Sequence, residues 1–120
     1  MAVVKVDFDK PYDEFEIGGE TYHVYFDDDS LRRYEKEADE FQKEALKQVD
    51  FSKMSARKRK EVETKQIEAI KDTIEPFFGE GSFDSIYAAS GKSMLNMVKV
   101  LEAVFDWLNT KVQSVNNRAA

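Results

Sequence analysis

The chain has 120 residues, of which 42% are hydrophobic, 35% are charged and none is cysteine. Its length suffices for one domain with a core and hardly for two. The net charge of −6 disfavours nucleic acid as the main partner, because phosphate binding needs a basic surface. The chain shows no signal-peptide pattern and no run of about 18 apolar residues, so we expect an intracellular protein without a membrane partner.

Residues 1–12 form a short mixed segment with some strand character. Its apolar residues alternate imperfectly with polar ones, and Pro11 ends any strand because proline has no N–H to give to a ladder. The apolar residues of this segment are Val3, Val4, Val6 and Phe8.

Residues 13–26 predict a β-hairpin. Two alternating runs flank Gly18 and Gly19, which can both adopt positive φ and so form a two-residue turn. A hairpin of two strands is marginal by itself, so we expect it to pack one face on helices or to donate an edge to a partner. The apolar face comprises Phe15, Ile17, Tyr22, Val24 and Phe26.

Four further segments have the residue spacing of helices. We expect Asp29 or Ser30 to cap the first and Ser82 to cap the short third. Pro76 lies late in the second, where it either kinks the helix or ends it early. The predicted helices span about residues 30–49, 55–78, 82–89 and 92–115, followed by a frayed tail at residues 116–120.

The last predicted helix has two apolar stripes, although a helix at the edge of a small domain needs only one. The first stripe, which includes Leu101, Phe105 and Leu108, has enough partners within the chain. The second either completes the core or meets another chain, and methionine and tryptophan suit partner binding. Our candidate partner-binding residues are therefore those of the second stripe: Met97, Val100, Val104 and Trp107.

No catalytic motif competes with these structural features. His23 is the only histidine and lies on the polar side of the hairpin, and the carboxylates show no metal-binding spacing. We therefore expect a protein that is not an enzyme, with no catalytic residue, cofactor or metal. A basic run at residues 53–60 leaves open a small nucleic-acid-binding regulator as an alternative.

These elements predict an α+β fold in which an N-terminal β-hairpin packs on a mainly helical bundle of three long helices and one short helix. The chain is expected to form a single domain over residues 1–120. A central helix with two apolar faces fits such an arrangement, because the hairpin and the other helices can cover it from several sides.

The order of these parts resembles the tail assembly chaperones of long-tailed bacteriophages and prophages of Gram-positive bacteria. The resemblance covers about residues 13–115 and rests on the hairpin with its acidic cap (residues 15–36), the segment IEPFFGEGSFDSIY (residues 74–87) and the last helix. It implies a non-enzymatic chaperone of virion morphogenesis in the host bacterial cytoplasm. Such a protein binds the tape measure protein and tail tube subunits and often forms a homo-oligomer. A structural virion or adaptor protein is the alternative.

Overall fold

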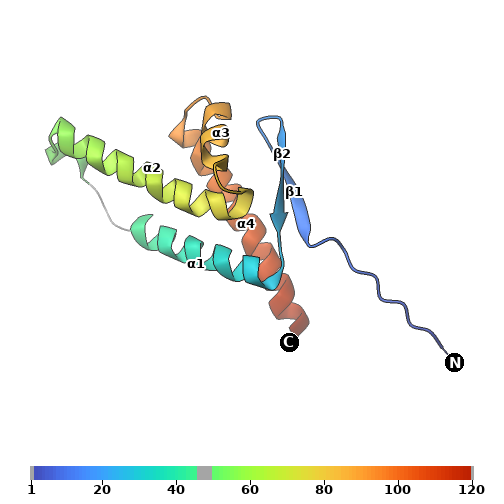
Figure 1. Cartoon of the computed structure of the whole chain (residues 1–120). Helices are drawn as coiled ribbons and strands as arrows, with labels where there is room; N and C mark the ends of the chain where they lie inside the picture. Colours follow the sequence, from blue (N-terminus) through green and yellow to red (C-terminus); the bar gives the residue numbers. More distant parts are fainter. Residues whose placement is uncertain (1, 46–49, 120) are drawn as a thin grey trace.

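The structure is a computed structural model that describes residues 2–45 and 50–119. A two-stranded antiparallel hairpin is followed by three long helices and one short helix, which confirms the predicted α+β class (Figure 1). Residues 46–49, the end of the first predicted helix, lie outside the described residues. The elements are β1 (Tyr12–Ile17), β2 (Glu20–Tyr25), α1 (Asp28–Ala45), a 3₁₀ turn (Phe51–Lys53), α2 (Ala56–Phe78), α3 (Ser82–Ala89) and α4 (Met94–Ala119).

The hairpin turns at the predicted glycine pair. Gly18 and Gly19 have φ values of 59° and 84°, a conformation that side chains with a Cβ atom disfavour. The register pairs Phe15 with Tyr22 and Asp13 with Val24. Val24 is fully buried, and the other members of the predicted apolar face pack against the core.

The helices form an antiparallel pair crossed by a third long helix. α1 and α2 run side by side, and α4 passes across the ends of both that are nearest the hairpin (Figure 1). α3 packs beside α2, and β2 contacts α2. α4 is therefore covered from several sides by its own chain, as expected of a central helix.

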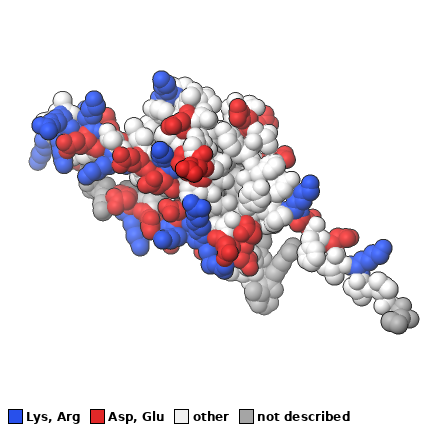
Figure 2. Space-filling model, in the orientation of Figure 1, with Lys and Arg blue, Asp and Glu red and all other residues white. Residues whose placement is uncertain are grey.

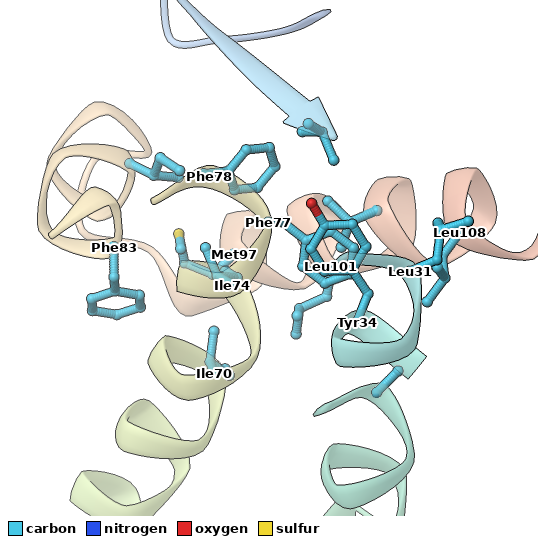
Figure 3. Close-up of a cluster of buried hydrophobic side chains, with 14 residues drawn as sticks. Leu31, Tyr34, Ile70, Ile74, Phe77, Phe78, Phe83, Met97, Leu101 and Leu108 are labelled. Atoms are coloured by element: carbon cyan, nitrogen blue, oxygen red, sulfur yellow. The ribbon is translucent and has the colours of Figure 1, made fainter. Parts of the chain in front are cut away.

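The core lies where α1, α2 and α4 meet beneath the hairpin (Figure 3). Tyr34 of α1 stacks on Phe77 of α2, with ring centroids 4.2 Å apart. Phe78 meets the hairpin residues Phe15 and Tyr22 edge to face, at 5.5 and 5.3 Å. The buried apolar residues are Val24, Leu31, Tyr34, Ala38, Ile70, Ile74, Phe77, Phe78, Phe83, Ile86, Met97, Leu101, Val104 and Leu108.

The two predicted helix caps are wrong. α1 begins at Asp28, and the Asp27 carboxylate accepts a hydrogen bond from the Ser30 backbone N–H at 3.2 Å. Ser82 is the first residue of α3 rather than its cap, and its hydroxyl donates to the Gly79 carbonyl. The Phe83 N–H points instead to the Glu75 carboxylate, 3.4 Å away, a partner that lies too far back in the sequence for local patterns to reveal.

The end of one long helix matches the prediction, and the end of another lies further along the chain. α2 ends at Phe78, as predicted, and so is not ended early by Pro76, because a proline in the last turn removes only one backbone hydrogen bond. α4 continues to Ala119, so the expectation of a frayed tail is wrong for residues 116–119. Apolar periodicity ends before this last turn, so it gave no sign that the helix continued.

Candidate partner-binding surface

The second stripe of α4 lies in the core. Met97 and Val104 have no exposed surface, and Val100 and Trp107 are partly buried and pack against the core cluster. Of the two alternatives left open by the sequence, the structure therefore places these side chains where they complete the core. They do not form an exposed stripe.

Trp107 joins the hairpin to α4. Its indole Nε1 donates a hydrogen bond to the Asp13 carboxylate at 2.7 Å. Its ring meets Phe15 edge to face at 5.8 Å and lies 6.1 Å from the ring of Tyr34. Trp107 is thus held by both strand and helix neighbours, which is typical of an anchoring core residue.

Asp13 is the centre of a small polar cluster that the sequence analysis missed. The Lys111 ammonium lies 2.8 Å from the same carboxylate oxygen and 4.5 Å from the centroid of the Phe26 ring. The hydrogen bond from Lys111, followed by that from Trp107, lowers the pKa of Asp13, while desolvation opposes the shift. The cluster ties the start of β1 to the second half of α4.

A pattern in the sequence could have revealed Asp13. Residues 13, 15 and 17 alternate with Glu14 and Glu16, so Asp13 shares the inward face of β1 with Phe15 and Ile17. A carboxylate at the edge of an apolar face needs a donor when the strand packs on a helix. The predicted face contained only its apolar residues, and therefore left out Asp13.

The exposed apolar side chains of α4 lie at its ends. Leu95 is 82% exposed and Val98 is 43% exposed near the start of the helix, and Val115 is 51% exposed near its end. Val98 and Val115 extend the first stripe of the sequence beyond its covered middle part. The exposed apolar surface of α4 is therefore found on different residues from those that the sequence suggested.

Charged residues of both signs crowd the ends of α1 and α2 that point away from the core (Figure 2). In the basic run, Arg57 and Lys58 lie 3.9 and 3.8 Å from the Glu61 carboxylate. Arg59 lies 3.3 Å from Glu63. Each of these three cations therefore lies near a carboxylate of its own helix.

His23 stacks on the Tyr12 ring at 4.2 Å, and its Nε2 lies 3.5 Å from a Glu14 oxygen on the outer face of the hairpin. Within residues 2–45 and 50–119, no group of three or more His, Asp or Glu side chains could hold a metal ion. In that same part of the chain, no helix is both long enough and apolar enough to cross a membrane.

Comparison with known proteins identifies the family of the chain. No curated protein and no solved structure matches it. One family model matches residues 20–120, a range that begins at β2 and includes all four helices. Since this range covers most of the sequence, the chain belongs to DUF6673, a family of unknown function.

Proposed function

We propose that the protein is a tail assembly chaperone of a long-tailed phage or prophage, which binds the tape measure protein and tail tube subunits without covalent chemistry. The resemblance in the order of hairpin, acidic cap and helices supports this proposal. The observation that carries it in the structure is the exposed apolar pair Leu95 and Val98 at the start of α4.

Leu95 and Val98 are three positions apart, so they lie on one side of the helix, about one turn from each other. Met94 beside them is partly buried, and its flexible thioether adapts to different partner surfaces. A helical segment with an apolar stripe can cover such a patch through contacts spaced by three or four residues. A tape measure protein, being long and helical, offers many stripes of this kind.

The rest of the molecule suits a soluble carrier of an apolar partner. Both strongly charged helices, α1 and α2, extend away from the core (Figure 2). Their mixed charges keep a complex hydrated while the apolar patch is covered. The proposal that the protein also recruits tail tube subunits rests on the resemblance to tail assembly chaperones.

Co-expression with the tape measure protein of the same genome tests the proposal. We expect the two proteins to copurify in solution. Leu95→Asp combined with Val98→Asp should weaken binding at least about tenfold, since burying one such side chain contributes roughly 1.5–3 kcal/mol. Gln113→Asp is the control, because it adds a charge to an exposed position about 27 Å further along α4.

The possible results test the proposed chaperone function and the proposed binding surface independently of each other. If the double variant copurifies with the tape measure protein as well as the wild type does, the binding surface lies elsewhere on the protein. Failure to bind the tape measure protein would reject the chaperone proposal. Mass spectrometry of purified particles addresses the structural alternative, because an assembly chaperone should be absent from the finished virion and an adaptor protein present.

A further inference from the structure

The segment before the hairpin is extended and exposes its apolar side chains. Residues 2–10 lead away from β1 without forming a helix or strand (Figure 1). Val4, Val6 and Phe8 are 84%, 68% and 89% exposed. They alternate with Lys5 and Asp7, so as a strand they would share one face. Exposed segments of this composition pair readily with sheet edges.

The same chain has an open strand edge. The Phe26 N–H donates to the Pro11 carbonyl at 2.8 Å, which continues the hydrogen-bonded pairs of the hairpin. The backbone groups of Glu14 and Glu16 fall between these pairs and therefore point away from β2. Within the described residues, no backbone hydrogen bond links Glu14 or Glu16 to another element. In the hairpin, β2 is the strand whose backbone lies nearer α2, and β1 lies on the side away from α2 (Figure 1).

The geometry at Lys10 and Pro11 prevents the segment from folding back tightly on its own β1. A two-residue hairpin turn needs positive φ at its first central position, and among described residues other than glycine only Lys92 has positive φ. Pro11 is already bound to Phe26, and the Lys10 carbonyl accepts from the Tyr12 N–H at 2.8 Å. This arrangement directs residues 2–9 away from the edge of the same molecule.

We propose that residues 3–9 of one copy add as a third strand to the outer edge of β1 in a second copy. An antiparallel register that places Lys5 opposite Glu14 also places Asp9 opposite Lys10, and it brings no like charges directly opposite each other. In this register Val4 lies opposite Phe15, on the face of the sheet that packs on the core. Each copy carries one donor strand and one acceptor edge, so the contact either closes into a ring or a dimer or continues as a chain.

The inference does not depend on the proposed function, because donor and edge belong to the same chain. Sedimentation equilibrium of the full chain tests it. We expect concentration-dependent self-association that Lys5→Pro weakens at least tenfold, since in this register the Lys5 N–H faces Glu14 and proline removes that donor. Lys5→Ala, which removes the charge but retains the N–H, is the matched control and should weaken association less.

Variants of Glu14 test the acceptor edge of β1. Glu14→Pro should block association while retaining the hairpin, because the Glu14 N–H points away from β2, and urea unfolding checks that the variant folds. Glu14→Lys should weaken association, and adding Lys5→Glu to it should restore most of the loss by exchanging the paired charges. A wild-type chain that remains monomeric up to about 1 mM, where even weak contacts are populated, would overturn the inference. Association that is unchanged in Lys5→Pro would also overturn it.

Discussion

Two apolar segments of this chain have opposite environments. Met97 and Val104 of α4 are fully buried, whereas Val4 and Phe8 before the hairpin are 84% and 89% exposed. The hairpin, α1 and α2 cover the helix, but Lys10 and Pro11 direct the N-terminal segment away from every neighbour. The comparison teaches that exposure depends on which surfaces the topology brings near a segment, and not on its hydrophobicity alone.

The largest effect is expected at the buried segment. Val104→Asp places a charge where no water reaches, and it should reduce the free energy of unfolding by about 3–5 kcal/mol. Urea unfolding followed by circular dichroism measures the change. Val115→Asp is the control on the same helix, since Val115 is 51% exposed and should change stability by less than about 0.5 kcal/mol. Equal losses in the two variants would mean that the burial of Val104 is not as described.

The packing of the hairpin on the helices can be weakened at the hairpin turn. A Cβ atom at Gly18 would lie 2.5 Å from the Ala89 Cβ, and the φ of 59° disfavours a β-branched residue. Gly18→Val should therefore cost about 2–4 kcal/mol through backbone strain and steric overlap together.

Gly19→Val isolates the backbone contribution to this loss. Gly19 has a φ of 84°, but no atom lies within 4 Å of the added Cβ position. Its loss should be about 1–2 kcal/mol, from strain alone. A Gly18 variant that is no less stable than the Gly19 variant would contradict the packing of the turn on α3.

A smaller effect is expected where Asp13 ties β1 to α4. Asp13→Asn removes the charge that Lys111 and Trp107 bind, and should cost about 1 kcal/mol near pH 7, because the site is partly exposed to solvent. Since the pKa of Asp13 is lowered in the folded protein, its stabilisation is present above the unfolded value of about 3.9. It is lost as the pH falls through the lower folded value.

Unfolding measured at several pH values checks this sign. The stability difference between the wild type and Asp13→Asn should be largest between about pH 5 and 7 and should shrink below about pH 4. A difference that grows on acidification would mean that the Asp13 pKa is raised and that the carboxylate is not stabilised by Lys111.

The smallest effect is expected at the exposed segment. Val6→Ser should leave the unfolding free energy of the monomer within about 0.5 kcal/mol of the wild type, because Val6 is 68% exposed. Thermal unfolding at low protein concentration measures this. A decrease of more than about 1 kcal/mol in the free energy of unfolding is larger than substitutions at exposed positions usually cause. It would show that residues 2–10 pack on their own chain.

Local patterns predicted most of the architecture. The Gly18–Gly19 turn, the apolar hairpin face and the four helices follow from residue spacing and backbone preferences that act over a few residues. The helix starts were harder to predict, because some of the partners that cap them lie outside such windows. Glu75 on α2, for example, accepts a hydrogen bond from the Phe83 N–H at the start of α3.

The partner surface could not be derived from periodicity. Both stripes of α4 are apolar, and only the three-dimensional arrangement decides that Met97 is covered while Val98 is 43% exposed. The sequence left Trp107 as a candidate for either the core or a partner surface, and its N–H is held by Asp13 from a strand far away in the sequence. Pairings of this range depend on how the hairpin docks, which no local pattern specifies.

Hydrogen–deuterium exchange tests most directly the claim that the buried stripe is core and the exposed segment meets other chains. At a concentration where the chain is monomeric, the backbone N–H groups of Met97–Leu108 should exchange slowly and those of residues 3–9 at the rate of an unfolded peptide. At high concentration, the N–H groups of Val3, Lys5 and Asp7 should become protected together with those of Glu14 and Glu16. Rapid exchange along Met97–Leu108 in the monomer, or no concentration dependence in residues 3–9, would contradict the account.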